Sequence, residues 1–240
     1  MKLTVIGTGS SGNCYVIQDE HEAIILEAGM SLAKVKQVLD FNVGKVAGCL
    51  ITHSHGDHSG KAKDFEAVFP VYANKHVIEA KGLKRAKEIE AEKGYKIGGF
   101  KVLPFHAHHD VPCLGFLINH EKFGNLLFIT DSFLCDYTFD DLNHILIECN
   151  YSDAAIDESV RNGLHWKVRE RVLTSHMELN TTKEVLQAQN LNNVHNILLI
   201  HLSSQNSDPE QFYDVIARAT GKPVTIAKSG VELELTKTVY

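Results

Sequence analysis

The sequence lacks any apolar run long enough to cross a membrane, and it has no low-complexity tract and no linker rich in proline, glycine or serine. The first absence argues against a membrane protein or a membrane partner. The second favours a single domain, which we expect to span residues 1–240, a length sufficient for a substantial core. Residues 1–7 hold too short an apolar segment for a signal peptide and predict a first strand instead.

Paired cysteines are also absent. The five cysteines are scattered, form no Cys-x-x-Cys motif and mostly have apolar neighbours. Buried free thiols are typical of a reducing compartment, so we expect a cytoplasmic protein. We expect neither thiolate metal ligands nor a thiol nucleophile.

The chain has no overall excess of basic charge. Its formal net charge of −6 argues against broad electrostatic binding to nucleic acid. Two segments depart from this balance: residues 61–101 carry ten Lys and Arg against six acidic residues, and a second basic run lies in the segment 161–171. The second run consists of Arg161, Lys167, Arg169 and Arg171. These segments form either a solvated helix face or a local phosphate-binding rim.

A Gly-x-Gly-x-x-Gly motif at residues 7–12 follows the first strand. This motif binds dinucleotide phosphates when a helix comes next. Here residues 13–17 and 22–26 are instead rich in strand-forming side chains. We therefore predict a three-strand meander in which the glycines form a tight turn.

The dominant feature is the segment Thr52-His53-Ser54-His55-Gly56-Asp57-His58-Ser59-Gly60, which directly follows the apolar run 46–51. The apolar run predicts a buried strand, and Gly56 allows a tight turn after it. Imidazole and carboxylate donors at this spacing can point into one pocket from a short loop, and they suit zinc, manganese or iron. The segment predicts a metal site.

Other metal-competent side chains lie where apolar segments end. Asp131 follows the run 126–130, and His201 follows the run 196–200. His109 lies in a polar segment between two further predicted strands. Strand ends at the same edge of a sheet can converge on one site, so we expect these residues to join the metal loop.

The remaining pattern predicts an α/β (α+β) protein, because strands dominate the first half and alternate with helices in the second. The predicted helices are 32–39, 61–65, 75–93 (as one helix or two broken at Gly82), 154–171, 181–191 and 209–219. Further strands are predicted at 68–73, 98–105, 114–119, 144–148, 223–227 and 231–236.

Together, the metal loop, His109 with Gly115 six residues later, Ile129-Thr130-Asp131-Ser132 and Leu199-Ile200-His201-Leu202-Ser203 resemble the motifs of the metallo-β-lactamase superfamily. The resemblance implies a four-layer αβ/βα sandwich of two mixed β-sheets flanked by helices. It also implies two divalent ions, Zn(II) or Mn(II) with Fe as an alternative. His53, His55 and His109 would hold one ion and Asp57, His58 and His201 the other, with Asp131 bridging. His106 and His108 are close enough to His109 that His108 could replace it.

Further motifs resemble the YycJ/WalJ-like branch of exonuclease-type proteins acting on DNA. They are Gly9-Ser10-Ser11-Gly12-Asn13, His109-Asp110, Glu148-Cys149-Asn150-Tyr151 and His201-Leu202-Ser203-x-x-Asn206. The resemblance implies that Asn13, Asn150, Ser203 and Asn206 contact substrate or support the ligands. His176 resembles an extra histidine of the nucleic-acid-processing branches, where it pairs with a glutamate that matches Glu148.

Two positions depart from the superfamily pattern. Glu27 stands at the end of the third strand, where the superfamily has an aspartate that lies beside the ligands rather than on the metal. The sequence around His176, Ser175-His176-Met177-Glu178-Leu179-Asn180, differs from Gly-His-Leu-Ser-Asn. Glu27 therefore bears on the rigidity of the metal loop, and the second departure bears on the role of His176.

The function expected from these residues is metal-dependent hydrolysis of a phosphodiester, as in a nuclease of the DNA exonuclease type. A hydroxide activated by two metal ions and positioned by Asp57 would attack, and His176, oriented by Glu148, would protonate the leaving oxygen. One alternative is a hydrolase of small thioesters, lactones or β-lactams, and a second is a non-catalytic metal or nucleic-acid binding module. The segment between Asp131 and His201 is too short for the cap domain of an RNase J-like enzyme, and no arm of the tRNase Z type is apparent.

Overall fold

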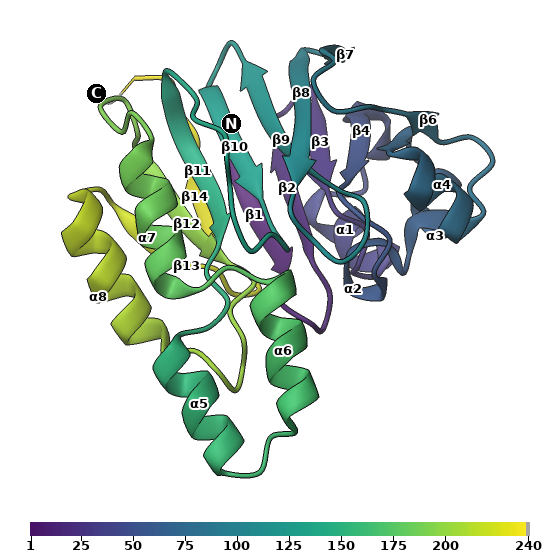
Figure 1. Ribbon diagram of the computed structural model, residues 1–240. Coiled ribbons are helices and arrows are strands. Elements are labelled where there is room, and N and C mark those ends of the chain that lie inside the picture. The colour runs from purple at the N-terminus through teal and green to yellow at the C-terminus, as the bar shows by residue number, and fades with distance from the viewer. Residues whose placement is uncertain (239–240) are drawn as a thin grey trace.

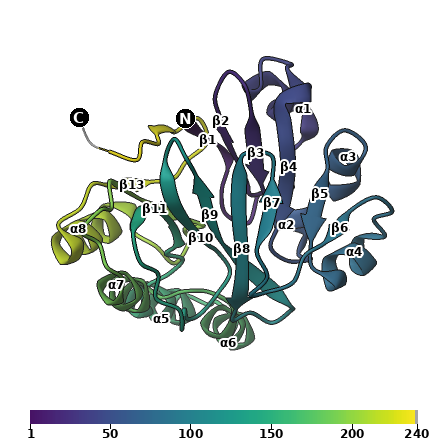
Figure 2. The ribbon, with the colours of Figure 1, turned by 90° about the horizontal axis from the view of Figure 1, so that it is seen from above.

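Two seven-stranded mixed sheets with helices on their outer faces make up the computed structural model, which describes residues 1–238 (Figure 1). Seen from above, α1, α3 and α4 lie outside one sheet and α6, α7 and α8 outside the other (Figure 2). The predicted αβ/βα sandwich of two mixed sheets is confirmed. Among residues 1–238, no helix combines the length and apolar character needed to cross a membrane.

The first sheet has the strand order β14-β1-β2-β3-β4-β5-β6. The strands β1, β2 and β3 form the predicted antiparallel meander. The glycine motif between β1 and β2 is therefore a turn and does not open a helix. β3, β4, β5 and β6 are parallel, and their carboxyl ends therefore reach the same edge. The strands are β1 (Lys2–Gly7), β2 (Cys14–Gln18), β3 (Ala23–Leu26), β4 (Val46–Ile51), β5 (Val71–Ala73), β6 (Lys87–Glu88) and β14 (Glu232–Glu234).

The second sheet has the strand order β13-β12-β11-β10-β9-β8-β7. An antiparallel meander from β7 to β10 is followed by the parallel strands β10, β11, β12 and β13. The strands are β7 (Tyr95–Ile97), β8 (Phe100–Ala107), β9 (Cys113–His120), β10 (Gly124–Ile129), β11 (Leu142–Glu148), β12 (Asn196–Ile200) and β13 (Val224–Ile226).

Helices cover the outer faces of both sheets. The short α2 holds part of the metal loop, and α5 and α6 form a hairpin below the second sheet (Figure 1). The helices are α1 (Leu32–Val38), α2 (Gly56–Ser59), α3 (Ala62–Glu66), α4 (Lys75–Lys81), α5 (Asp153–Arg161), α6 (Trp166–Ser175), α7 (Leu179–Ala188) and α8 (Pro209–Thr220), with a 3-10 turn η1 (Val43–Lys45).

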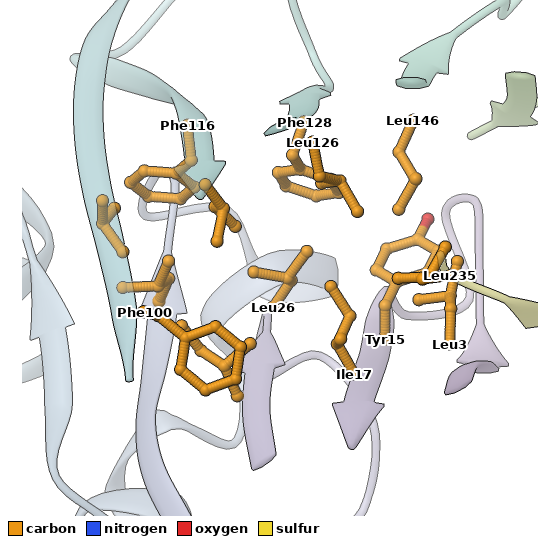
Figure 3. Packing of buried hydrophobic residues seen from close by; sticks show 14 of the residues in the cluster. Leu3, Tyr15, Ile17, Leu26, Phe100, Phe116, Leu126, Phe128, Leu146 and Leu235 are labelled. Carbon is orange, nitrogen blue, oxygen red and sulfur yellow. The ribbon is translucent and has the colours of Figure 1, made fainter. Parts of the chain in front are cut away.

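Side chains that point alternately to the two faces of each strand divide the apolar core into three layers, one between the sheets and one between each sheet and its outer helices. Tyr15 and Ile17 of β2 face the space between the sheets, whereas Val16 faces the outer helices. Between the sheets, side chains such as Leu26 pack opposite Phe116 and Phe128 (Figure 3). Because successive side chains of a strand point to opposite faces, strands buried on both faces are almost wholly apolar. The core between the sheets holds them in the register that places their ends together.

The prediction of a helix over residues 75–93 is wrong beyond Gly82. α4 begins at Asn74, whose Oδ1 accepts a hydrogen bond from the Val77 amide at 2.9 Å. It ends at Gly82, which has φ +60°, a left-handed conformation that terminates helices. The chain then adds β6 to the edge of β5, and the Ile89 amide donates to the Ala73 carbonyl at 2.9 Å. Pairing with a distant strand replaces the helix that the local pattern favours.

The prediction of one helix over residues 154–171 also needs correction. The structure divides it into α5 and α6, with Gly163 at φ +104° between them. Ser152 caps α5 by accepting a hydrogen bond from the Ala155 amide at 3.4 Å. The left-handed glycine reverses the chain, so the basic residues of α6 return toward the sheet edge (Figure 1).

Close backbone approach at Gly29 holds the metal loop against the end of β3. The amides of Asn13 and Ala28 donate to the carbonyls of Asp57 and His58, each at 2.7 Å. A Cβ atom at Gly29 would overlap the Asp57 carbonyl.

We expect Gly29→Ala to destabilise the fold by about 1–3 kcal/mol and to lower the metal content, because the added methyl must push the loop away. Gly44→Ala is the matched control, since its Cβ would meet only Asn42 Oδ1 at 3.9 Å. Urea unfolding and metal analysis measure the two effects. Equal stability and metal content in both variants would contradict this role of Gly29.

Candidate metal site

The end of β4 delivers His53 into the site. Thr52 and His53 are fully buried, and Thr52 Oγ1 lies 2.8 Å from His53 Nδ1. This contact occupies Nδ1, so Nε2 is the nitrogen that faces the other donors. A hydrogen bond to the far nitrogen fixes the ring orientation of metal-binding histidines.

The single turn of α2 places Asp57 and His58 beside His53. His55 precedes the helix, and its carbonyl accepts a hydrogen bond from the Ser59 amide at 2.9 Å. His58 Nε2 then lies 3.4 Å from Asp57 Oδ2. The donors at positions 55, 57 and 58 thus come from one short turn after β4.

Three other strands bring Asp131, His201 and His109 to the same place. Asp131 and His201 follow β10 and β12, and both residues are about 2% exposed. His109 follows β8, and its Nδ1 lies 3.0 Å from the Ser175 carbonyl, so its Nε2 faces the site. Asp131 and His201 have φ of +47° and +56°, a left-handed conformation that costs most residues energy. The surrounding structure holds this strain at the site.

The Asp131 carboxylate lies between two groups of histidines. Its Oδ2 is 3.7 Å from His53 Nε2 and 3.8 Å from His109 Nε2. Its Oδ1 is 3.3 Å from His58 Nε2 and 3.0 Å from His201 Nδ1. His55 joins the first group, with Nδ1 3.1 Å from His109 Nε2. This arrangement places one carboxylate oxygen against each group.

These residues fit divalent metal ions. Two sets of donor atoms, each lying within 4.8 Å of one another, could hold an ion. They are His53, His55, His109 and Asp131 in one set, and Asp57, His58, Asp131 and His201 in the other. Within the described residues, the buried His53 Nε2 and His201 Nε2 have no hydrogen-bond partner. Buried polar atoms are normally paired, so unpaired nitrogens directed at carboxylates indicate a cation site.

Electrostatics at the site hold His53 and Asp131 in the protonation states that metal ligands need. Burial, with His58 nearby, holds the pKa of His53 well below the usual histidine value, so this imidazole is neutral. Burial would raise the pKa of Asp131, but His201 and His58 outweigh it and hold that pKa well below its usual range. A neutral imidazole and an ionised carboxylate are the forms that bind metal. Burial would lower the pKa of His58 and His201, but Asp131 outweighs it and raises both pKa values well above the usual histidine value, so a metal ion would have to displace a proton from these two.

Glu148 and His176 form a hydrogen-bonded pair next to the donors. Glu148 is fully buried at the end of β11, and its Oε1 lies 2.7 Å from His176 Nδ1 and 2.9 Å from His201 Nδ1. Its Oε2 accepts hydrogen bonds from the amides of Ser132 and Met177 at 3.0 and 3.3 Å. Burial would lower the pKa of His176, but Glu148 outweighs it and raises that pKa above the usual histidine value.

This pair belongs to a third set of possible donors, formed by Asp131, Glu148, His176 and His201. Since both Glu148 oxygens already accept hydrogen bonds, the geometry equally suits a carboxylate that orients two imidazoles. Nδ1 of His176 is engaged, and the ring lines the cavity in front of the site.

The predicted supporting residues divide into two kinds. Glu27 lies behind His58, with its Oε1 3.4 Å from His58 Nδ1. Asn13 Nδ2 is instead 2.9 Å from His58 Nε2, the nitrogen that faces Asp131. Asn150, Ser203 and Asn206 line the cavity, whose volume is about 710 Å³. Asn150 Nδ2 also donates to the His201 carbonyl at 2.7 Å.

Asp110 is a site neighbour that the sequence reasoning did not assign. Its Oδ1 is 3.2 Å from His109 Nε2 and 3.4 Å from His55 Nε2. The signal in the sequence was the His109-Asp110 motif, from which we expected no role for Asp110 itself. Two members of the second basic run, Lys167 and Arg171, also line the cavity.

The fold and this site define the class of the protein. The family model described as the metallo-beta-lactamase superfamily matches residues 7–141, more than half of the chain, and the chain belongs to that superfamily. The predicted membership is confirmed.

Similar proteins include several named as nucleases. The chain is 24% identical to exodeoxyribonuclease YycJ of Bacillus anthracis, over 88% of this chain and 85% of that protein. It is 28% identical to ribonuclease J of Helicobacter pylori, over 58% of this chain but 24% of that protein. Among solved structures, YhfI of Bacillus subtilis has a TM-score of 0.75 with 18% identity, covering 97% of this chain and 98% of that one. Human tRNase Z, short form, has a TM-score of 0.63 with 16% identity, covering 98% and 99%.

The positions of His108 and His109 predict which of these two histidines binds metal, a choice that the sequence left open. His108 Nε2 lies 2.6 Å from Asp136 Oδ2. His106, His108 and His109 all line a neighbouring cavity of about 960 Å³, but only His109 also lines the cavity in front of the metal site. We expect His109→Ala to lower the number of bound ions per chain and His108→Ala to leave it unchanged. Metal analysis after dialysis compares the two variants. A greater loss in His108→Ala would reverse the assignment.

Proposed function

We propose that the protein is a metal-dependent phosphodiesterase that cleaves nucleic acid, with DNA favoured over RNA. The observation that carries this proposal is the His176–Glu148 pair at 2.7 Å. His176 lines the same cavity as Asp57 and Asp131, and Glu148 is buried behind it. A hydrolase needs donors for activating water, and a phosphodiesterase also benefits from an acid for the leaving group.

The donor sets around Asp131 would hold two divalent ions, one with His53, His55 and His109 and the other with Asp57, His58 and His201. When bound, such ions supply an activated water at neutral pH and offset the negative charge of a phosphodiester. Asp57, which is part of the cavity wall, is positioned to orient that water. No side-chain nucleophile is required.

His176 is the proposed general acid. Glu148 engages Nδ1, which leaves Nε2 as the nitrogen able to donate a proton toward the cavity. The leaving group in cleavage of a nucleic acid is an alkoxide, a poor one, so a positioned acid accelerates the step by about 10²–10⁴-fold. Hydrolysis of thioesters or lactones gains less from such an acid, and the pair therefore favours a phosphodiester.

Names of relatives support a nucleic acid substrate. The exodeoxyribonucleases match across most of both chains, and the ribonuclease J matches over a smaller part. This difference in coverage is our reason for preferring DNA.

An assay of end-labelled single- and double-stranded DNA and RNA, with Zn²⁺ or Mn²⁺ added, tests the proposal. We expect cleavage of DNA that Asp57→Ala reduces at least about 100-fold, because Asp57 would serve both as ligand and in orienting water. Turnover of a thioester and lactone panel without nucleic acid cleavage would instead support the small-substrate hydrolase. Metal binding without any turnover would support a non-catalytic module.

The role of His176 as general acid predicts that the rate loss in His176→Ala depends on the leaving group of the substrate. We expect His176→Ala to slow cleavage of an oligonucleotide by about 10²–10⁴-fold with metal content intact. It should slow bis(p-nitrophenyl) phosphate hydrolysis far less, because p-nitrophenolate leaves without a proton. His21→Ala, at an exposed turn, is the control. An equal reduction of the cleavage rate on both substrates would show that His176 is not the general acid.

A further inference from the structure

The basic helix α6 forms one wall of the cavity in front of the metal site. Lys167, Val168, Arg171 and Val172 line this wall, which ends at His176. The helix rises from the tip of the α5–α6 hairpin toward the sheet edge (Figure 1). A molecule that reaches the metal site along this wall passes the two basic side chains first.

These two basic residues differ from their basic neighbour on the same helix. Arg169 Nε pairs with Asp157 Oδ1 at 2.9 Å and joins α6 to α5. Lys167 and Arg171 form no ion pair with any residue of the range 1–238. Both are exposed and both line the cavity, so their charges are available to an anionic ligand.

Spacing along the helix suits a chain of phosphates. Residues four apart on a helix share one face and are displaced by about 6 Å along the axis. This displacement is comparable to the step between neighbouring phosphates of an extended strand. The same cavity is also lined by Ser203, Ser204 and Gln205, uncharged polar side chains of the kind that contact phosphates and sugars.

An exposed aromatic side chain, Trp166, begins the same helix next to Lys167, outside the set of residues that line the cavity. Trp166 is 54% exposed, and Lys167 Nζ lies 5.6 Å from the centre of its ring. A large exposed indole beside an ammonium group is the combination that binds single strands, in which a base stacks on the ring and the cation holds a phosphate. Duplex DNA offers no free base faces for such stacking.

We infer that a single strand of nucleic acid lies along α6, with Arg171 and Lys167 holding successive phosphates beside the cleaved one and Trp166 stacking a base further out. This inference rests on the proposed phosphodiesterase function and names its substrate form as an extended single-stranded end. Small phosphodiesters reach the metal site without touching Trp166.

Binding of a fluorescein-labelled, phosphorothioate-linked oligothymidylate to the metal-loaded protein tests the inference by fluorescence anisotropy over a range of salt. We expect Lys167→Ala/Arg171→Ala to weaken binding at least about tenfold at low salt and to reduce the slope of log Kd against log salt by about 1.4, or about 0.7 per phosphate. Lys96→Ala/Lys101→Ala is the matched control, since these exposed residues pair across β7 and β8.

Trp166→Ala separates stacking from charge. We expect it to weaken binding of the single strand by about 5- to 100-fold, with the salt slope unchanged and duplex binding unaffected. Thermal unfolding of each variant checks that α6 remains folded.

Unchanged affinity and slope in Lys167→Ala/Arg171→Ala would overturn the inference and leave a solvated helix face. Wild-type hydrolysis of bis(p-nitrophenyl) phosphate without binding of the oligothymidylate would also overturn it, while the proposed phosphodiesterase would stand. Binding with the expected variant effects but without cleavage of either substrate would support the strand path and contradict the proposed function.

Discussion

The site depends on one buried carboxylate. Asp131 is 2% exposed, and its two oxygens face different groups of histidines within 3.0–3.8 Å. An ionised carboxylate in such a position is costly unless cations or donors surround it. Four imidazoles do so here, and the unpaired Nε2 atoms of His53 and His201 in turn need a cation. Metal ions held by the two donor sets that share Asp131 would satisfy both requirements, and we therefore propose that the two sets form a single centre.

The sandwich creates this centre by bringing strand ends together. Parallel strands β3 and β4 of one sheet and β10, β11 and β12 of the other finish at the same edge of the molecule. Glu27, Asp131 and His201, each directly or nearly after a strand, all have positive φ. Such strain persists only where the surroundings fix the backbone. The apolar core between the sheets provides that support, so the same packing that stabilises the fold positions the donors.

Much of the fold and of the candidate site was predictable from local sequence patterns. The predictions that failed or stayed open share one physical cause, which is that they depend on contacts formed only in the tertiary structure. Apolar runs that end in Asp131 and His201 predicted the strands because side-chain periodicity is a local property. The expected meeting point followed from the general rule that strand ends at one edge of a sheet can converge on a site. The helix predicted over residues 75–93 failed beyond Gly82 because β6 pairs with β5, a strand on the other side of α4 in the chain. The choice between His108 and His109 was open for the same reason: the contact that orients His109 comes from Ser175 on α6. The proximity of Asp110 to His55 likewise depends on the tertiary fold.

Native mass spectrometry of the folded protein, after equilibration with Zn²⁺ or Mn²⁺, counts the ions that Asp131 would join in one centre. We expect two ions per chain in the wild type and at most one in Asp131→Ala, with Asp136→Ala retaining both. A wild type that binds fewer than two ions, or an Asp131→Ala variant that still holds two, would contradict the proposed single centre.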